Sequence, residues 1–391
     1  NYAIIGTPLK DTAPDVTSEG VAYIYNVTTG ALVYTLDNPN AYSTDSGDQF
    51  GTSVAISGNY AIVGADGEDD AGGYSSGKAY IYNVTTGALL HTLDNPNAYG
   101  TSQADYFGES VAISGDYAIV AASGEDDASG DLSGKAYIFN VTTGALLHTL
   151  DNPNPYGTSY QDYFSLSIAI SDNYAIVGAW GEDDAGGTTS GKAYIYNVTT
   201  GALLHTLDNP NAYGTSANDG FGFSVAISDN YAVVAASGPY SIYNTAEDDA
   251  GGTNSGKVYI FDVITGALLH TLDNPNAYGT STNDFFGVST VISGNNLIVG
   301  ANQEDDAGGT KSGKVYIFDL ITLTNLTEEN YAGIADAVYS DAATATIQTA
   351  GSVDDAQSGL TPGQAYYVQG DGTLATTPGT PSVFAGTAVS A

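Results

Sequence analysis

Residues 107–163 read FGESVAISGDYAIVAASGEDDASGDLSGKAYIFNVTTGALLHTLDNPNPYGTSYQDY, and most of the chain consists of copies of this stretch. The phenylalanine that opens each copy recurs at Phe50, Phe107, Phe164 and Phe221, always 57 residues apart. The next one, Phe286, follows after 65 residues because eight extra residues, about 239–246, lie inside the preceding copy. A period of this size is typical of repeated structural units packed side by side.

Each copy contains four short segments that alternate apolar and polar residues or form brief apolar runs, and turn residues separate them. In the copy quoted above, we predict strands over Phe107–Ser114, Tyr117–Ala122, Lys135–Asn140 and Ala145–Leu150. An acidic, glycine-rich loop joins the second segment to the third, and Val-Thr-Thr-Gly forms a hairpin turn into the fourth. No segment has helical periodicity. Four short antiparallel strands per repeat are typical of a propeller blade.

The number of copies predicts the architecture. The third segment occurs six times, centred on Tyr23, Tyr80, Tyr137, Tyr194, Tyr259 and Tyr316, and the opening copy lacks its first segment. We therefore expect an all-β fold with a β-propeller of about six four-stranded blades over residues 1–322, or seven if further sequence precedes. Residues 323–391 are expected to form a small β-rich module, with one short helix over residues 325–338.

The charge balance limits the partners. Aspartate and glutamate number 44 against seven lysines, which gives a formal net charge of −37. Nucleic acids and anionic membranes require a basic surface, so neither is the default partner. The chain has no cysteine, and no apolar run approaches the ~20 residues needed to span a bilayer. We expect neither thiol chemistry nor membrane insertion.

The acidic loops are the candidate metal sites. Each groups three carboxylates beside flexible glycines, and hard cations such as calcium bind carboxylate oxygens. The candidates are Glu68, Asp69 and Asp70; Glu125, Asp126 and Asp127; Glu182, Asp183 and Asp184; Glu247, Asp248 and Asp249; and Glu304, Asp305 and Asp306. The alternative is a solvated loop whose aspartates cap turns and whose carboxylates pair with the lysine ten residues further on. No other cofactor is indicated.

Other chemistry-bearing residues recur at one position in the repeat. The repeated lysines are Lys78, Lys135, Lys192, Lys257 and Lys314, and the four histidines are His91, His148, His205 and His270. Tyr34 replaces the histidine in the first copy, so this position is expected to serve packing. An active site occurs once, whereas a residue repeated in every blade is explained by the blade. We therefore predict no enzyme activity, although 44 acidic residues leave a carboxylate pair for glycoside hydrolysis open.

Binding residues are better sought where the copies differ. The eight-residue insertion carries Tyr240, Ile242 and Tyr243, and Trp180 ends a second strand where other copies have small or polar residues. Aromatic side chains on propeller loops are suited to stacking on sugar rings or to contacting protein surfaces. Local packing adjustments are the alternative explanation.

The repeat resembles the FG-GAP repeat, the blade of the integrin α-subunit propeller, in its divergent bacterial and viral form. The resemblance is carried by Phe107-Gly108, the SVAIS strand, the SGKAYIF segment at 133–139, and Gly64-Ala65-Asp66, Ala121-Ala122-Ser123, Gly178-Ala179-Trp180 and Gly300-Ala301-Asn302 where the family has Gly-Ala-Pro. It covers residues 1 to about 322 and implies a propeller. FG-GAP blades often carry a calcium loop between the first two strands. Here only Ser-Gly-Asn, Ser-Gly-Asp or Ser-Asp-Asn stands there, too short to surround a cation.

The end of the chain is similar to a C-terminal module of tail-fibre-like and other structural proteins of marine bacteriophages. The similar segments are SGLTPGQAYYVQGDGTLATTP and SVFAGTAVSA. The resemblance implies a non-enzymatic structural or binding protein of the virion surface or the extracellular space. Its loops would contact a host-surface glycan or protein, and its C-terminal module would join other subunits in an oligomer or larger assembly. A secreted bacterial adhesin and a carbohydrate-active propeller enzyme are the alternatives.

Overall fold

The structure is a computed structural model. The residues it describes are 2–11, 17–39, 47–70, 73–96, 103–126, 131–153, 161–184, 187–210, 217–238, 246–247, 252–275, 281–305, 310–320 and 323, together with five short strands after residue 333. The chain divides into two compact units, Asn1–Phe318 and Asp319–Ala391. Each unit is described here by itself.

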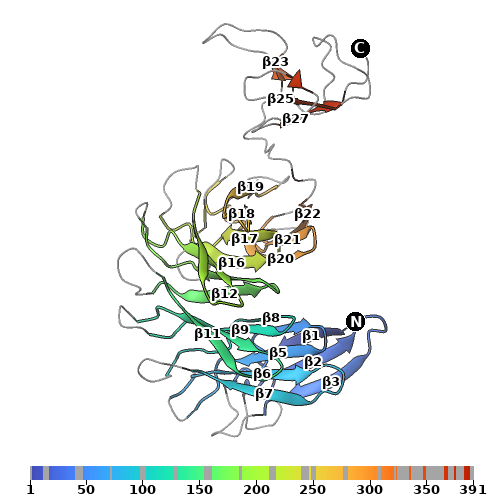
Figure 1. Ribbon diagram of the computed structural model, residues 1–391, viewed down its shortest axis with the longest axis vertical. Coiled ribbons are helices and arrows are strands. Elements are labelled where there is room, and N and C mark those ends of the chain that lie inside the picture. Colours follow the sequence, from blue (N-terminus) through green and yellow to red (C-terminus); the bar gives the residue numbers. More distant parts are fainter. Residues whose placement is uncertain are drawn as a thin grey trace. The chain divides into compact units, whose positions relative to one another are not determined.

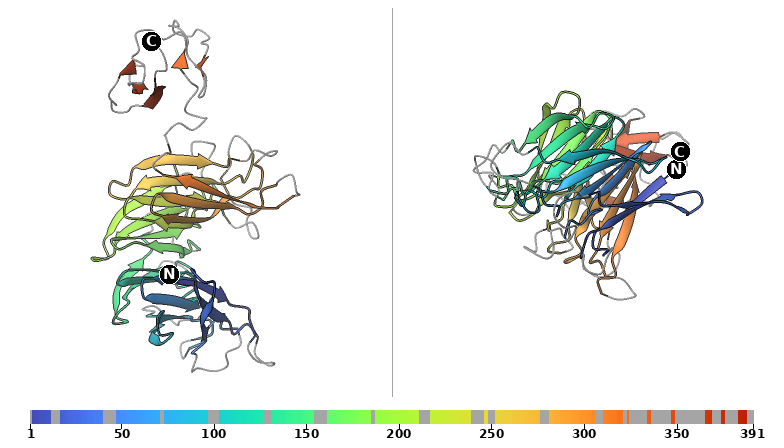
Figure 2. Two further views of the ribbon diagram at one scale, coloured as in Figure 1. Left: turned by 90° about the vertical axis from the view of Figure 1, so that its right-hand side faces the viewer. Right: turned by 90° about the horizontal axis from the view of Figure 1, so that it is seen from below.

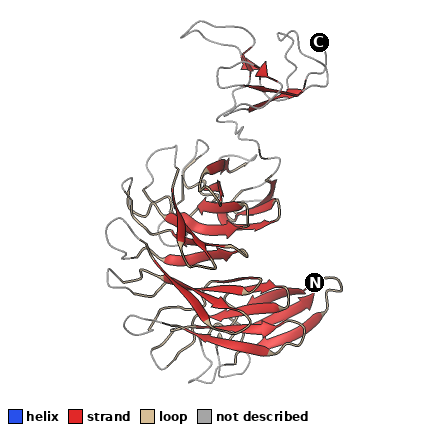
Figure 3. Cartoon of the chain, in the orientation of Figure 1, coloured by secondary structure: helices blue, strands red, loops and turns tan. Residues whose placement is uncertain are grey.

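The described residues of the first unit form six antiparallel sheets whose strands follow one another in chain order (Figure 1). Their strands are β1 (Tyr2–Thr7), β2 (Val21–Asn26) and β3 (Leu32–Asp37) in the first sheet; β4 (Val54–Ser57), β5 (Tyr60–Ala65), β6 (Lys78–Asn83) and β7 (Leu89–Asp94) in the second; β8 (Val111–Ser114), β9 (Tyr117–Ala122), β10 (Lys135–Asn140) and β11 (Leu146–Asp151) in the third; β12 (Phe164–Ile170), β13 (Tyr174–Ala179), β14 (Lys192–Asn197) and β15 (Leu203–Asp208) in the fourth; β16 (Phe221–Ile227), β17 (Tyr231–Ala236), β18 (Lys257–Asp262) and β19 (Leu268–Asp273) in the fifth; and β20 (Phe286–Ser293), β21 (Asn296–Ala301) and β22 (Lys314–Asp319) in the sixth. The expected all-β propeller is confirmed, and Figure 3 shows strands and no helix among the described residues.

In the second to fifth sheets, the second strand lies at the centre of the packing, as its apolar run predicts. In β9, Ile119 packs toward the fourth sheet and Val120 packs toward the second. Both side chains are buried. A strand with neighbours on both faces needs apolar residues at successive positions, which explains why the alternation disappears in this segment.

The surface where one sheet packs on the next, here called a junction, repeats along the unit. At the junction of the second and third sheets, Ile62 and Ile81 pack against Phe107, Tyr137 and their neighbours. The ring centroids of Phe107 and Tyr137 lie 5.8 Å apart. Burying one such ring contributes on the order of 2–3 kcal/mol, so each repeat supplies much of the apolar burial that its neighbour needs.

The first strands of successive sheets lie side by side, and hydroxyl groups connect them. The Ser53 hydroxyl accepts a hydrogen bond from the Val111 amide at 2.9 Å, and the Ser167 hydroxyl accepts one from the Val225 amide at 3.0 Å. β4, β8, β12, β16 and β20 are neighbours in this order. The view from below in Figure 2 shows the sheets of the first unit packed side by side.

The first and sixth sheets each leave one face uncovered among the described residues. Ile317 in β22 is 71% exposed, whereas the equivalent Ile195 in β14 is buried between sheets. At the other end of the unit, Ile5 in β1 is 51% exposed, whereas the equivalent Val63 is buried. Each of these exposed residues marks a sheet face that no other sheet covers in the described part of the chain.

The described residues of the second unit after residue 333 form short strands. β23 (Ile334–Ala335) pairs with β24 (Ile347–Gln348), and β25 (Ala365–Val368) lies between β26 (Leu374–Ala375) and β27 (Val383–Thr387). The helix expected over residues 325–338 is wrong at Ile334–Ala335, where pairing with a second segment satisfies the backbone and the β-branched Ile334 favours extension. The rest of that range lies outside the described residues. Within the described residues there is no helix long and apolar enough to cross a membrane.

Candidate functional site

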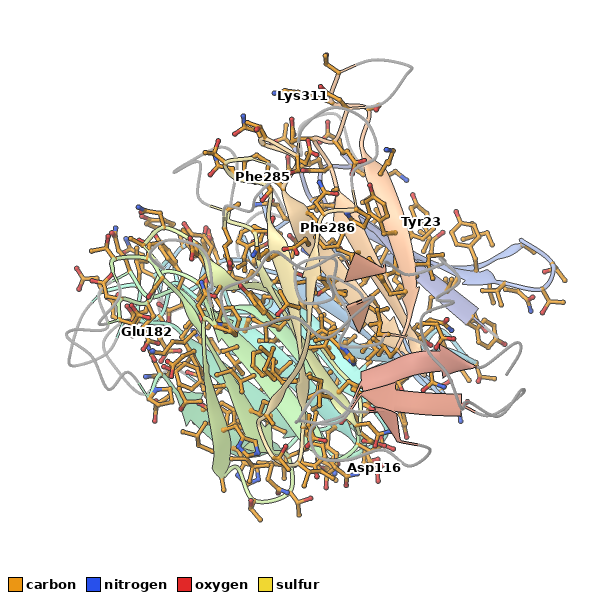
Figure 4. The ribbon with its side chains drawn as sticks, turned by 90° about the horizontal axis from the view of Figure 1, so that it is seen from above. Tyr23, Asp116, Glu182, Phe285, Phe286 and Lys311 are labelled. Atoms are coloured by element: carbon orange, nitrogen blue, oxygen red, sulfur yellow. The ribbon has the colours of Figure 1, made fainter. Side chains whose placement is uncertain are left out.

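The glutamate of each acidic loop is buried and bonded to a tyrosine, not presented to solvent. The loop turns back immediately after the second strand, and the Glu68 side chain has no exposed surface. The Tyr80 hydroxyl donates to Glu68 Oε2 at 2.5 Å, and the Tyr194 hydroxyl donates to Glu182 Oε2 at 2.5 Å. The same contact joins Tyr137 to Glu125, Tyr259 to Glu247 and Tyr316 to Glu304. Figure 4 labels Glu182 near the loop end of the sheets.

Burial changes the acidity of this pair. It raises the pKa of Glu68 and Glu125 to about 7 and that of Glu182 and Glu247 to about 8, although the tyrosine hydrogen bond opposes the shift. Burial is the main cause that raises the phenol pKa of Tyr80 well above its usual value, and the charge of the neighbouring glutamate adds to this shift. The carboxyl is therefore easily protonated and the phenol stays neutral. The pair is a structural hydrogen bond that recurs in five sheets.

The repeated lysine does not pair with the acidic loop in most copies. Lys78 Nζ lies 2.8 Å from Asp94 Oδ1, and Lys135 Nζ lies 2.9 Å from Asp151 Oδ1. Lys192 pairs with Asp208 in the same way. The loop pairing predicted from the sequence is wrong for these copies, because the lysine stands directly opposite the last aspartate of the fourth strand in the ladder.

In the last two copies the lysine reaches the buried glutamate, as predicted. Lys314 Nζ lies 2.6 Å from Glu304 Oε1. Lys257 Nζ lies 3.2 Å from Asp273 Oδ1 and 3.7 Å from Glu247 Oε1. One lysine position therefore serves two carboxylates that flank it.

The aspartates of the acidic loops bond to their own loop backbone. Asp69 Oδ1 accepts from the Ser75 amide at 2.9 Å, and Asp70 Oδ1 accepts from the Gly73 amide at 3.1 Å. Asp126, Asp183 and Asp305 accept equivalent bonds from the amides of Leu132, Thr189 and Lys311. The three carboxylates of a loop thus point to different partners, and no group of three metal-ligating side chains converges within the described residues. Asp127, Asp248, Asp249 and Asp306 lie outside those residues.

A second buried acid stands beside each of these glutamates. Asp105, two residues before Phe107, accepts a hydrogen bond from Asn95 Nδ2 at 2.8 Å. Burial raises the pKa of Asp105 to about 7, and the charge of Glu125 adds to the shift. The copies at Asp48, Asp162, Asp219 and Asp284 have the same asparagine bond. The signal was visible in the sequence as an aspartate at a constant distance from each opening phenylalanine.

The repeated histidine connects one sheet to the hairpin turn of the next. His91 Nε2 donates to the Thr142 carbonyl oxygen at 2.9 Å, and His148 Nε2 donates to the Thr199 carbonyl oxygen at 3.0 Å. In the first sheet the Tyr34 hydroxyl donates to the Thr85 carbonyl oxygen at 2.6 Å. The position therefore makes a hydrogen bond across the junction in addition to the packing that the Tyr34 replacement predicts.

Trp180 lies inside the unit. It is 4% exposed, it stacks on Tyr163 at a centroid distance of 5.3 Å, and Phe223 meets it edge-on at 6.3 Å. This aromatic cluster fills the junction of the fourth and fifth sheets. The position matches the packing explanation for Trp180. Tyr240, Ile242 and Tyr243 lie outside the described residues.

Two tyrosines that the sequence reasoning overlooked are exposed. Tyr74, in the second sheet's acidic loop, is 57% exposed, and Tyr106, just before the third sheet's opening phenylalanine, is 38% exposed. Their segments are hydrogen-bonded neighbours, because the Ala104 amide donates to the Tyr74 carbonyl oxygen at 2.9 Å and the Tyr106 amide donates to the Ser75 carbonyl oxygen at 3.1 Å. The available signal was that Tyr74 replaces a threonine or aspartate of the other copies.

Glu109 and Asp66 form an unusual acidic pair close to these tyrosines. The Ser123 amide donates to Glu109 Oε1 at 2.8 Å, and the Glu109 amide donates to the Tyr106 carbonyl oxygen at 3.1 Å. Burial raises the pKa of Glu109 to about 8, and the charge of Asp66 adds to this shift. Burial also raises the pKa of Asp66.

Comparison with known protein families identifies the repeat. The model of the FG-GAP repeat matches residues 41–82, 97–139, 155–196, 211–261 and 276–318, which is more than half of the chain. The chain belongs to the FG-GAP repeat family. A comparison with curated proteins finds no match.

These FG-GAP copies have a minimal connection between their first and second strands. β4 ends at Ser57 and β5 begins at Tyr60, and β8 ends at Ser114 and β9 begins at Tyr117. A residue with positive φ closes the turn, for example Gly58 at 56°. The space between the strands contains no loop long enough to supply several oxygen ligands to a cation, as the sequence indicates. Figure 4 labels Asp116 in this turn.

Proposed function

We propose that this FG-GAP protein is a non-enzymatic structural and binding protein of the virion surface or the extracellular space. The observation that carries the proposal is the use of the repeated polar residues. Glutamate binds tyrosine, lysine binds aspartate, and histidine binds a turn carbonyl in one sheet after another. These contacts hold the blades together, so the surface loops remain as the part of the unit that is free to vary for recognition.

A phage fibre or appendage component is the form that the sequence favours. The resemblance of residues 358–391 to a module of phage structural proteins supports this form, with the second unit joining other structural subunits. The strongly acidic composition supports an exposed, soluble location and a partner other than nucleic acid. The partner at the loops would be a host-surface glycan or protein.

An adsorption assay tests the proposal. Fluorescently labelled full-length chain is incubated with a panel of bacterial cells, and bound chain is measured against concentration. We expect saturable binding to a subset of cells. The double substitution Tyr240→Ala and Tyr243→Ala tests the insertion, and we expect it to weaken adsorption. The control is Leu147→Ala on the outer strand β11. Absence of saturable binding to every cell type would count against the proposal.

A virion and a bacterial cell surface are two sites for the same binding role. Antibody labelling of purified virions under the electron microscope separates them. We expect labelling of virions at a fibre or appendage. Labelling confined to the surface of bacteria would favour the secreted adhesin.

A carbohydrate-active enzyme is a second candidate, and one observation favours it. Glu109 has a pKa raised to about 8 and lies beside the acidic Asp66, which is the kind of pair that glycoside hydrolysis uses. Incubation of the chain with polysaccharides tests this candidate by release of reducing ends. Release that Glu109→Gln abolishes would establish an enzyme, whereas we expect none.

A further inference from the structure

The junction of the second and third sheets departs from the repeat at one exposed position and one half-buried position. Tyr74 stands where the equivalent residues are Asp131, Thr188, Thr253 and Thr310. Glu109 stands where they are Thr52, Leu166, Phe223 and Val288. Repetition explains residues that every blade needs, so departures that gather at one junction require a separate explanation.

Tyr106 adds a conformational argument. Its φ is 56°, a left-handed value that is strained for a bulky residue. The second copy has Gln49 at this position and the fifth has Gly220, with φ values of 57° and 62°, and only the glycine adopts such a value without strain. In the fourth and sixth copies, packing of the aromatic ring offsets this backbone strain, because Tyr163 stacks on Trp180 and Phe285 is buried.

The Tyr106 ring is packed less closely than the rings of Tyr163 and Phe285. Ser123 replaces Trp180 in this copy, and the Tyr106 ring lies against Gly124 with more than a third of its surface exposed. An exposed aromatic residue in a conformation that glycine would adopt more easily is poorly explained by stability. It is well explained by a contact that the ring makes with a ligand.

These residues occupy one small region. The segments of Tyr74 and Tyr106 are connected by the backbone hydrogen bonds described above, and Glu109 is held one turn after Tyr106. The Ser123 amide holds the Glu109 carboxyl in place. Two exposed aromatic rings beside a positioned carboxyl provide both apolar faces and a hydrogen-bond acceptor.

We propose that Tyr74, Tyr106 and Glu109 form a binding site for a neutral carbohydrate. The aromatic rings stack on the apolar faces of sugar rings, and the Glu109 carboxyl accepts a hydrogen bond from a sugar hydroxyl. The surroundings disfavour an anionic ligand, since Asp69 and Asp126 lie in the adjacent loops and the chain carries a net charge of −37. The inference rests on the proposed binding function and names its ligand class.

Titration with neutral oligosaccharides tests the site. The probes are maltohexaose, cellohexaose and mannohexaose, added to the full-length chain in an isothermal titration calorimeter, with alginate as an anionic comparison. We expect saturable binding of at least one neutral probe and none of alginate. Tyr74→Ser and Tyr106→Gly should each weaken that binding at least about tenfold, and Glu109→Gln should weaken it less because the amide oxygen still accepts.

The control variants separate loss of the site from loss of the fold. Leu147→Ala changes an exposed residue of the same sheet and should leave Kd unchanged. Binding that is unaffected by Tyr74→Ser and Tyr106→Gly would overturn the proposed site. Failure of all three neutral probes, while the chain still adsorbs to cells, would overturn the carbohydrate assignment and leave the proposed binding function standing. Failure of both assays would overturn both.

Discussion

The buried glutamate shows how one residue type can look catalytic and act structurally. Glu125 Oε2 accepts from Tyr137, and no hydrogen-bond partner faces Glu125 Oε1. Such a group is more stable protonated, which explains its raised pKa of about 7. Because the pKa of the folded state lies above the unfolded value of 4.5, the folded state binds the proton more tightly. Its stabilising effect is complete below pH 4.5 and is lost as the pH rises toward 7.

Glu125→Gln isolates this effect. The glutamine keeps an oxygen that accepts from Tyr137 and cannot ionise. Between pH 4.5 and 8, we expect the free energy of unfolding to fall by about 3 kcal/mol less in the variant than in the unmodified chain. Urea denaturation at a series of pH values measures the difference. The general repulsion among the acidic residues is common to both proteins, so identical pH profiles would show that Glu125 is not the titrating group.

At the element scale, the contact between one sheet's fourth strand and the next sheet's hairpin turn depends on a glycine. Gly144 has a φ of 70°, and a Cβ at this position would lie 2.7 Å from His91 Nδ1. The glycine therefore lets the turn approach the imidazole, which donates to the neighbouring carbonyl. The same arrangement joins His148 to the turn that contains Gly201.

Substitutions of His148 separate the hydrogen bond from packing. His148→Tyr should be tolerated, because Tyr34 makes the equivalent bond in the first sheet. His148→Phe keeps the ring and loses the donor, so we expect it to lower the free energy of unfolding by about 1 kcal/mol. Chemical denaturation of both variants measures the difference. Equal stability of the two variants would show that packing alone matters at this position.

Strand patterns could be predicted from sequence because they are local. The second and third segments of the quoted copy begin and end where β9 and β10 do. The predicted lysine pairing was wrong in three of five copies because it depends on register across the ladder, where Lys78 stands opposite Asp94. The exposure of Tyr74 and the burial of Trp180 depend on which ring the neighbouring sheet supplies, and a single copy contains no such information.

At the scale of the whole molecule, equivalent residues differ in burial, because one face of the first sheet and one face of the sixth sheet are uncovered. Ile195 is enclosed between the fourth and fifth sheets, whereas Ile317 in the sixth sheet is exposed. Ile195→Asp would bury an unpaired charge, and we expect it to cost at least ~3–5 kcal/mol. Ile317→Asp should change stability by less than ~0.5 kcal/mol. Denaturation of both variants measures this contrast, and an equal cost would show that a further element covers the sixth sheet.

The account holds that repeated residues build the blades and that recognition occurs where one junction departs from the repeat. Tyr106→Gly tests this most directly when oligosaccharide binding and stability are measured on the same sample. We expect the Kd for the neutral probe to rise at least about tenfold while the free energy of unfolding changes by less than ~1 kcal/mol, because relief of the left-handed strain offsets lost packing. Unchanged binding together with a loss of stability above ~2 kcal/mol would contradict the account, because Tyr106 would then be a structural residue like Tyr163.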